Sequence, residues 1–393
     1  MRRRELLKLM TAVPALAAFP RWSFAAGDAL GRDRLIYIYL RGGADGLTLC
    51  PPVGDPHYFD LRPTLAIAEA DVLPLDAMFG LHPAAQGLKT LYDEGELALV
   101  HACGLATAQR SHFEAQSATE QGIDAADPAF GTGWVGRYLN GIEVATPLAV
   151  IALDTAVPQA LAGSAAALAM ASVDDFGLSL PSDLLSVLGA MYGGDETLKA
   201  TADAVFTAAE AIGPITEIEV GENYPQGELG AALADAGRLI RGEAGLVAAA
   251  INFGGWDHHD SQAARMEPLA TELGDALAAF REDIGVEWNN TMIVVQTEFG
   301  RRAGENASAG TDHGHGGVML LAGGGVDGGR VIGDWPGLEG AALSAGEDLA
   351  VTTDYRQVLA ELLAHRLGVA DLASVFGDWQ PEPWQGIFLP RAA

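Results

Sequence analysis

The chain has 393 residues, 49% of them hydrophobic, which is enough to bury a large core. It carries 23 basic and 52 acidic residues, a formal net charge of −29. A negative field of this size repels nucleic-acid phosphates and anionic lipid, so we expect neither as a partner. No apolar run beyond the N-terminus is long enough to span a bilayer, so stable membrane insertion is not expected. The charge fits a cation-binding protein, although many soluble proteins are acidic for solubility alone.

Residues 1–26 have the organisation of an export signal. The basic run RRRELLK at residues 2–8 is followed by a short apolar stretch and by small residues at 25–26. The run resembles a twin-arginine signal, which predicts the twin-arginine export machinery as a partner and a periplasmic or secreted location. An amphipathic N-terminal helix is the alternative. An oxidising compartment would allow Cys50 and Cys103 to pair, and the sequence leaves their pairing open.

Runs that favour strands alternate with helical patterns along the rest of the chain. Continuous β-prone runs predict strands buried on both faces, at residues 34–40, 97–104, 147–153, 246–253, 291–296 and 318–322. Helices are expected over 182–212, 227–241, 260–284 and 354–367. Thr353 or Asp354 would cap the last of these.

This alternation predicts an α/β fold, with a central, mostly parallel sheet and helices on both faces. Residues 27–393 are expected to form a single domain. The Ala- and Gly-rich region 155–245 has few chemically reactive residues. We interpret it as a helical cap insertion that does not form a domain of its own.

Polar side chains gather at the ends of the predicted strands. In open α/β sheets, ligands bind beyond the carboxyl ends of the strands. Carboxylate oxygens and imidazole nitrogens are the ligands of zinc and related divalent ions. We therefore predict a metal site with zinc as the expected ion and manganese or calcium as alternatives. The predicted ligands are Asp45, Asp257, His259, Glu298, Asp312, His313 and His315.

Each of these residues also has an ordinary structural explanation. Asp45 stands in a Gly-rich turn, where an aspartate often bonds its own backbone. Glu298 is also a natural partner for Arg301 or Arg302. A single His-x-His is common on surfaces. The prediction depends on the coincidence that four of the nine histidines lie in two short loops, each beside an aspartate.

The order of motifs resembles that of the bacterial DUF1501 family over residues 33–380. This family is regarded as a relative of the alkaline phosphatase and sulfatase superfamily. The resemblance implies an alkaline-phosphatase-like fold and a small anionic ester as substrate. The segments that carry it are Arg41-Gly-Gly-Ala-Asp45-Gly-Leu, Leu81-His-Pro, Arg110-Ser-His-Phe-Glu-Ala-Gln116, Gly254-Gly-Trp-Asp-x-His259-x-x-Gln262, Thr297-Glu-Phe-Gly-Arg301 and Thr311-Asp-His-Gly-His-Gly316.

The resemblance also implies roles for individual residues. Asp45 would be the first metal ligand, Ser111 the nucleophile at a helix start, Asp257 and His259 an Asp–His ligand pair, Glu298 a strand-end ligand, and His313 or His315 the last histidine. The chain departs from the superfamily pattern at three points. Glu298 replaces an aspartate, Phe299 stands where a histidine is expected, and the spacing of Asp257 and His259 is tighter. Either His258 or the extra histidine of 313–315 fills the lost ligand position, or only one of the superfamily's two metals binds.

Ser111 has a second interpretation. Ser111-His-Phe-Glu114 matches a capping box, in which the serine hydroxyl satisfies a helix amide and the glutamate reaches back. A helix N-terminus also stabilises a phosphate or sulfate group, and Arg110 could hold such an anion through two hydrogen bonds. We therefore predict Ser111 and Arg110 as catalytic residues, with helix capping as the alternative for Ser111.

Two functions are compatible with these features. The first is an exported, metal-dependent hydrolase of phosphate or sulfate esters. The second is a non-catalytic exported binding or assembly protein that keeps the fold and a structural metal.

Overall fold

The computed structural model describes residues 33–176 and 207–390 of the chain. The predicted export signal lies outside the described residues, as does most of the predicted helix 182–212, of which residues 207–212 are described and helical. Among the described helices, none combines the length and apolar character needed to cross a membrane.

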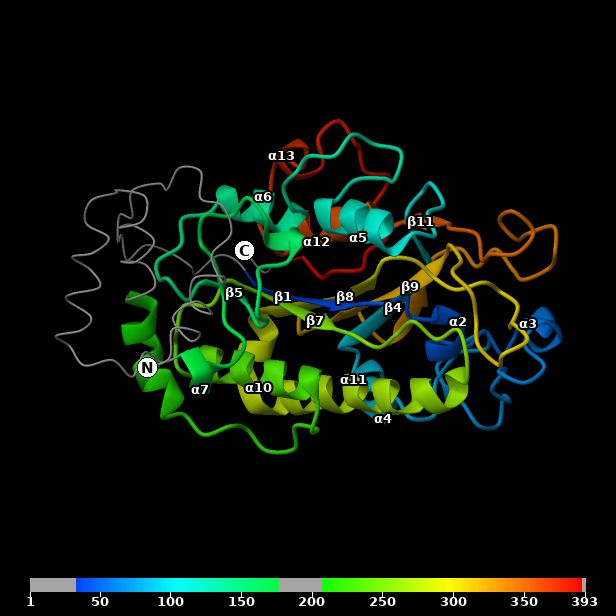
Figure 1. Ribbon diagram of the computed structural model, residues 1–393, viewed down its shortest axis with the longest axis horizontal. Helices are drawn as coiled ribbons and strands as arrows, with labels where there is room; N and C mark the ends of the chain where they lie inside the picture. The colour runs from blue at the N-terminus through cyan, green and yellow to red at the C-terminus, as the bar shows by residue number, and fades with distance from the viewer. Residues whose placement is uncertain (1–32, 177–206, 391–393) are drawn as a thin grey trace, which may run out of the picture.

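A nine-stranded sheet forms the centre of the structure (Figure 1). Its strands are β1 Arg34–Leu40, β4 Leu97–Gly104, β5 Val150–Ala152, β6 Ala167–Ala169, β7 Ala248–Phe253, β8 Thr291–Thr297, β9 Gly317–Ala322, β10 Arg330–Ile332 and β11 Thr353–Asp354. Eight of them lie in the order β10-β4-β9-β8-β1-β7-β5-β6, and β11 pairs with β4. All pairs are parallel except those of β9, which is antiparallel to β4 and β8.

Strand β1 shows why the sheet is covered on both sides. Ile36 and Ile38 pack into one hydrophobic core, whereas Leu35 and Tyr37 pack into the other. Successive side chains of a strand point to opposite faces, so a continuous apolar run needs a cover on each face.

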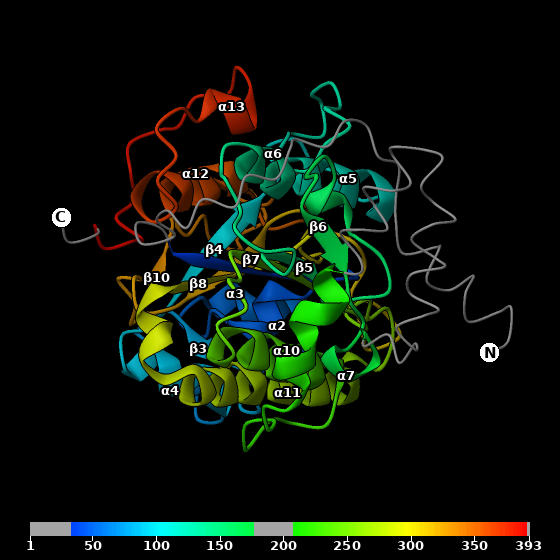
Figure 2. The same ribbon diagram turned by 90° about the vertical axis from the view of Figure 1, so that its left-hand side faces the viewer.

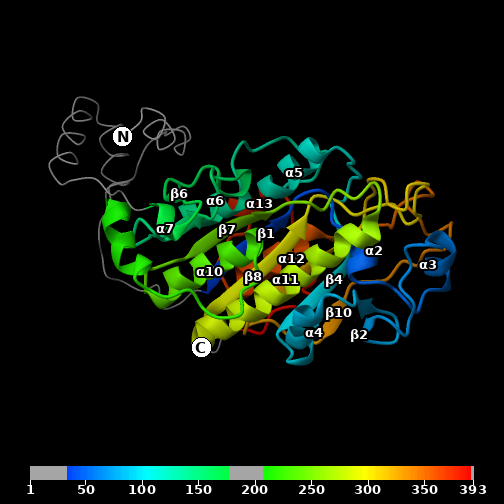
Figure 3. The same ribbon diagram turned by 60° about the horizontal axis from the view of Figure 1, so that its bottom comes forward.

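Two layers of helices provide this cover (Figures 1 and 2). One layer contains α4 Gln86–Asp93, α10 Glu228–Arg241 and α11 Gln262–Ile284, which Figure 3 brings forward. The other contains α5 His112–Gln121, α6 Trp134–Asn140, α12 Tyr355–His365 and α13 Ala373–Phe376. As predicted, Asp354 caps α12, because its carboxylate accepts a hydrogen bond from the backbone N–H of Arg356.

Short elements complete the described part. They are α2 Gly46–Leu49, α3 Pro56–Leu61, the paired strands β2 Leu73–Pro74 and β3 Gly80–Leu81, the 3-10 helices η1 Gln159–Leu161 and η2 Gly285–Asn290, and α7 Val173–Phe176. Both cysteines, whose pairing the sequence left open, are buried free thiols. Burial raises the pKa of each thiol, so both are protonated and unreactive.

The predicted α/β class is confirmed. Each predicted strand corresponds to a strand of the sheet, although the one expected at 147–153 is shortened to β5. Within the region 155–245, β6 pairs with β5 and α10 packs on α11. The middle of that region lies outside the described residues, so the cap insertion stays a prediction.

Candidate metal centre

The candidate site lies at the edge of the sheet where β1, β4, β7 and β8 end. Because β9 is antiparallel to its neighbours, the loop that leads into β9 lies at the same edge as the loops that follow the parallel strands. Loops distant in sequence therefore meet at one place, toward the right-hand end of the sheet in Figure 1.

Three histidines and one aspartate converge at this edge. Asp257 Oδ1 lies 3.0 Å from Nε2 of His259 and 3.2 Å from Nε2 of His313, and these two nitrogens are 2.9 Å apart. His112, the first residue of α5, places its Nε2 3.5 Å from Asp257 Oδ2. Ligand atoms of His112, Asp257 and His313 all lie within 4.8 Å of one another. We call these four residues the His/Asp cluster.

Each imidazole of the cluster is held through its other ring nitrogen, Nδ1. The three pairs are His112 with Glu298 Oε1 at 2.8 Å, His259 with Asp312 Oδ1 at 3.1 Å, and His313 with the backbone carbonyl of Arg110 at 2.8 Å. Carboxylates and carbonyls accept hydrogen bonds, so the network assigns the proton of each ring to Nδ1. The Nε2 lone pairs of the neutral rings are then directed into the cluster.

Protonation within the cluster follows from its neighbours. Burial opposes the charge of Asp257, but the hydrogen bond and charge of Arg301 outweigh burial and lower the pKa of Asp257 to about 2. Burial, together with the charge of Arg301, lowers the pKa of His313, so this ring is neutral at pH 7. The hydrogen bond to Glu298 raises the pKa of His112. A proton therefore competes with any cation at His112.

These donors fit a divalent metal ion. Imidazole nitrogens with a carboxylate oxygen are typical zinc ligands. Nε2 of His112 is buried and has no hydrogen-bond partner within the described residues, so its lone pair is available to a cation. Metal-bound imidazoles in proteins are commonly oriented by a carboxylate or carbonyl on the second nitrogen, as all three are here.

Arg301 and Gly42 hold the loops of the cluster together. The buried guanidinium of Arg301 donates to the backbone carbonyls of Gly42, Gly43 and Thr311, and to Asp257 Oδ1 at 2.5 Å. Gly42 has a φ of +123°, and a Cβ on it would lie 2.5 Å from the backbone nitrogen of Asp257. Only glycine allows the loop after β1 to approach so closely.

Phe299 forms an apolar wall beside the cluster. Its ring centroid lies 5.0 Å from that of His112 and 4.8 Å from that of His313. Where the resemblance implies a histidine, this chain packs an aromatic ring against two histidines from other loops. The buried ring keeps water from one side of the cluster and limits the movement of both imidazoles.

Glu298 and Asp312, both predicted as ligands, each hold an imidazole of the cluster. Burial disfavours the charge of Glu298, but hydrogen bonds from His112 and Gln116 outweigh burial and lower its pKa. The hydrogen bond from His259 lowers the pKa of Asp312. Both carboxylates are therefore ionised at neutral pH and orient the rings that they contact.

Asp45 lies apart from the cluster, in a closed ion pair. Its two carboxylate oxygens accept hydrogen bonds from Arg62 at 2.5 and 3.1 Å, and Thr48 and Gln262 donate at 2.7 and 2.5 Å. Both charged side chains are buried. Burial disfavours the charge of Asp45, but Arg62 outweighs it and lowers the pKa of Asp45. The structure does not bring Asp45 to the other predicted ligands.

His315 also lies outside the cluster. Its ring is buried, with Nε2 placed 2.7 Å from the backbone carbonyl of Leu105. Among the described residues, its Nδ1 has no hydrogen-bond partner. Of the seven predicted ligands, the structure therefore brings Asp257, His259 and His313 together in the cluster, and Asp312 contacts His259 at its other ring nitrogen.

The predicted capping box at Ser111 is wrong. Ser111 precedes α5, but its side chain makes no hydrogen bond to the helix amides. Glu114 accepts a hydrogen bond from the Gln109 side chain at 2.5 Å, and the Ser111 N–H donates to Gln109 Oε1 at 2.9 Å. The Ser111 hydroxyl is thus not used for capping. In the sequence, Ser111 stands between Arg110, whose carbonyl contacts His313, and the cluster residue His112.

Arg110, the other predicted catalytic residue, is partly engaged by the chain itself. Its Nε and Nη2 atoms donate to Oδ2 of the buried Asp348 at 3.1 and 2.5 Å. Its backbone carbonyl holds His313. Arg110 therefore helps to build the site through its backbone as well as through its charge.

His112 was missed by the sequence-based prediction of ligands. In the sequence, His112 is recognisable only as the residue that follows the expected helix cap Ser111. One signal could have found it, because segment 110–116 follows the second predicted strand, at the edge where the other candidate ligands gather.

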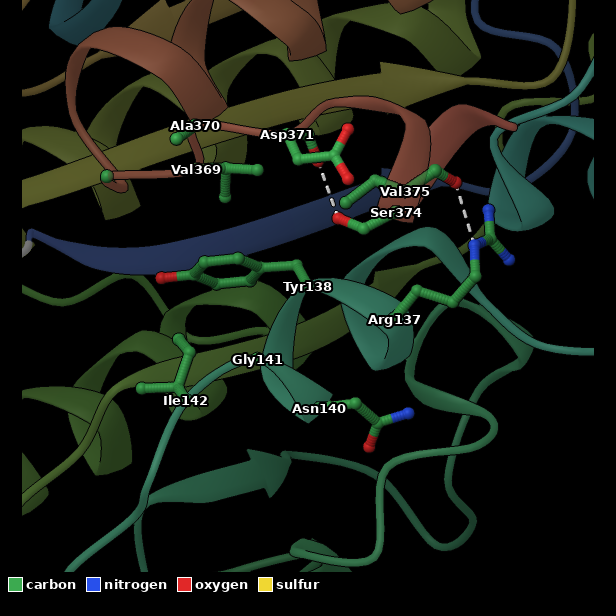
Figure 4. Close-up of a pocket in the computed structure, with 11 residues that line it drawn as sticks. Arg137, Tyr138, Asn140, Gly141, Ile142, Val369, Ala370, Asp371, Ser374 and Val375 are labelled. Carbon is green, nitrogen blue, oxygen red and sulfur yellow. Dashed lines mark hydrogen bonds between the residues drawn. The ribbon is translucent and has the colours of Figure 1, made fainter. Parts of the chain in front are cut away.

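A cavity of about 450 Å³ lies away from the cluster, between α6 and α13 (Figure 4). Arg137 is the only basic residue in its lining, and it donates to the backbone carbonyls of Val375 and Thr132 at 2.7 and 2.5 Å. The cavity therefore offers no free cation for an anionic ligand, and we assign it no function.

The DUF1501 family, described as proteins of unknown function, matches residues 98–376. This range is more than half of the chain, so the protein belongs to the DUF1501 family. All four cluster residues lie within the matched range, whereas Asp45 and Arg62 precede it.

Similar solved structures include two hydrolases. The two are the PsFucS1 sulfatase of Pseudoalteromonas sp. (12% identity, 91% of this chain and 70% of that chain, TM-score 0.37) and a phosphonate monoester hydrolase of Agrobacterium radiobacter (13%, 90% and 79%, 0.32). A third similar structure is that of the PH0037 protein of Pyrococcus horikoshii (12%, 75% and 86%, 0.30). No curated protein matches the chain. The α/β class rests on the sheet itself.

Proposed function

We propose that this protein is an exported, metal-dependent hydrolase of phosphate or sulfate esters. The observation that carries the proposal is the convergence of three imidazole nitrogens and one carboxylate at the strand-end edge, with each imidazole held from behind. The predicted signal at residues 1–26 supports export through the twin-arginine machinery to the periplasm or the medium.

The proposed roles follow from the contacts. His112, His259 and His313, with Asp257, would hold the ion, with zinc expected and manganese or calcium as alternatives. When bound, such an ion supplies a Lewis acid that stabilises negative charge on the ester oxygens. Ser111 is the proposed nucleophile, because its hydroxyl is not used for capping. Its place at the start of α5 also favours an anionic group nearby.

A second function, that of a non-catalytic exported binding or assembly protein with a structural metal, is favoured by one observation. The cluster offers four protein donors, and structural zinc sites use four protein ligands, whereas catalytic sites keep one position for water or substrate. The role of Asp257 distinguishes the two functions. Arg301 engages its Oδ1, and the side chain is 45% exposed. As a fourth ligand Asp257 would complete a structural site, whereas a carboxylate that faces the substrate would leave the fourth position open for catalysis.

Elemental analysis of the mature protein tests the metal site. We expect about one equivalent of a divalent ion. The ion should be lost in His112→Ala, His259→Ala and His313→Ala and retained in His57→Ala, a control on the half-exposed face of α3. If neither the wild type nor any variant contains metal, even after reloading, the cluster is only a polar network and the proposal is wrong.

A panel of phosphate and sulfate esters then separates the two functions. Hydrolysis by the metal-loaded protein that is lost in Ser111→Ala supports the hydrolase. Stable metal without hydrolysis of any ester supports the structural-metal protein.

A further inference from the structure

Glu347 lies between two arginines beside the His/Asp cluster. Its carboxylate is 3.0 Å (Oε2) and 3.3 Å (Oε1) from the two terminal nitrogens of Arg302, and Oε2 is 3.6 Å from Nη2 of Arg110. The three side chains are partly open to solvent, with exposed fractions of 48% for Glu347, 35% for Arg302 and 37% for Arg110. Two partly exposed cations thus flank one partly exposed carboxylate.

The two arginines are anchored to the loop that carries His313. The backbone carbonyl of Arg110 faces His313 Nδ1 at 2.8 Å, and the backbone N–H of Arg302 donates to the Asp312 carbonyl at 2.9 Å. Arg301, next to Arg302, pairs with His313 in a β-bridge. An anion between these arginines would therefore lie next to the candidate metal centre.

Each of the two arginines has a carboxylate partner of its own. Arg110 is matched by the buried Asp348, which accepts from its Nε and Nη2. Among the described residues, Arg302 forms its ion pair with Glu347, and its charge also helps to lower the pKa of Asp312. When the Glu347 carboxylate moves away, both terminal nitrogens of Arg302 lose their carboxylate partner.

Glu347 is placed so that its side chain can leave at little cost. Its backbone is fixed, since its N–H donates to the Ser344 carbonyl and its carbonyl accepts from Ala303. A half-exposed ion pair contributes little to stability. A tetrahedral oxyanion has enough oxygens to accept charge-assisted hydrogen bonds from both guanidinium groups, whereas the Glu347 carboxylate stays 3.6 Å from Arg110.

We infer that Arg110 and Arg302 form the subsite for the phosphate or sulfate group of the ester, and that Glu347 occupies this subsite until the ester displaces it. The inference rests on the proposed function for the identity of the ligand. The subsite itself is defined by contacts that do not involve a metal ion.

Binding of inorganic phosphate and sulfate to the mature, chelator-treated protein tests the subsite by calorimetry. Glu347→Gln should tighten anion binding about fivefold, the ratio that corresponds to about 1 kcal/mol for an exposed ion pair. Arg302→Gln should weaken it by a similar factor or more. Displacement of bound sulfate by 4-nitrophenyl sulfate would assign the subsite to the ester. Binding of the inorganic anion alone would overturn that assignment.

Glu287→Gln is the matched control. Glu287 pairs with Arg34 at 2.6 Å, with exposed fractions of 40% and 25%, beside the opposite ends of β1 and β8. Equal tightening in Glu287→Gln would mean a general effect of net charge and would overturn the inference, as would an unchanged affinity in Glu347→Gln. Because no turnover is measured, anion binding stands or fails separately from the proposed hydrolysis.

Discussion

The Asp45–Arg62 pair and the His/Asp cluster both place carboxylates at the same edge of the sheet, yet they balance charge differently. Arg62 contacts both oxygens of Asp45, and both side chains are buried. Arg301 engages only Oδ1 of Asp257, and the Nε2 atoms of three imidazoles lie 3.0 to 3.5 Å from this carboxylate. An aspartate at a strand end is thus a candidate ligand only where the chain supplies no complete counter-charge of its own.

Removing Arg62 should have the largest effect on stability. Arg62→Met leaves a buried, uncompensated carboxylate at Asp45, and we expect the free energy of unfolding to fall by about 3–5 kcal/mol. Urea unfolding followed by circular dichroism measures this change. The double variant Asp45→Leu/Arg62→Met should recover most of the loss. A cost below about 1 kcal/mol for Arg62→Met would mean that the pair is not a closed ion pair.

Chelation should separate the two sites. With the ion at a hundredfold excess over its Kd, chelator should lower the unfolding free energy of the wild type by about 2.7 kcal/mol. His313→Ala should show no such loss. Arg62→Met should lose the same amount of unfolding free energy as the wild type. Asp45 pairs with the Arg62 side chain and not with a metal ion, so this variant leaves the metal site intact. A chelator effect that persists in His313→Ala would place the ion elsewhere.

Glu298→Gln should weaken metal binding by tenfold to a hundredfold, because Glu298 orients His112. Glu298 raises the pKa of His112, and a proton competes with the ion below that pKa. The variant lowers this pKa, so the midpoint of metal binding against pH should move to lower pH. Metal titrations between pH 5 and 9 measure both effects. If the pH midpoint of metal binding does not move, Glu298 does not act through His112. Gln116→Ala removes a hydrogen bond to Glu298 but keeps its charge, and it serves as the control.

Ser111→Ala should have the smallest effect on stability. Its hydroxyl does not cap α5, so the change in unfolding free energy should stay below about 0.5 kcal/mol. Asp354→Ala removes a real cap from α12 and should cost about 1 kcal/mol in the same thermal or urea assay. Equal losses in the two variants would restore the capping role of Ser111. Loss of ester hydrolysis in Ser111→Ala without loss of stability would support its proposed role as nucleophile.

Part of the site was predictable and part was not. Asp257, His259 and His313 were recognisable because ligand-type residues cluster in short loops after or before buried strands. Asp45 follows the same pattern, but Arg62, 17 residues away, engages its carboxylate. His112 carries no local mark of a candidate ligand, since it reaches the cluster only when α5 packs beside the loops from β7 and β8. Counter-charges and ligands contributed by distant loops are invisible to local patterns.

The sequence by itself determined six of the nine strands of the described sheet, the α/β class and the loops in which chemistry is concentrated, because apolar runs and their bounding glycines act over a few residues. The short strands β6, β10 and β11 carry no such β-prone run. The tertiary structure alone decided which of these loops meet. A loop that leads into a parallel strand would lie at the opposite edge of the sheet. The antiparallel direction of β9 brings His313 to Asp257. Strand direction, the partner of each ring nitrogen and the arginine that neutralises each carboxylate depend on packing between segments far apart in the chain.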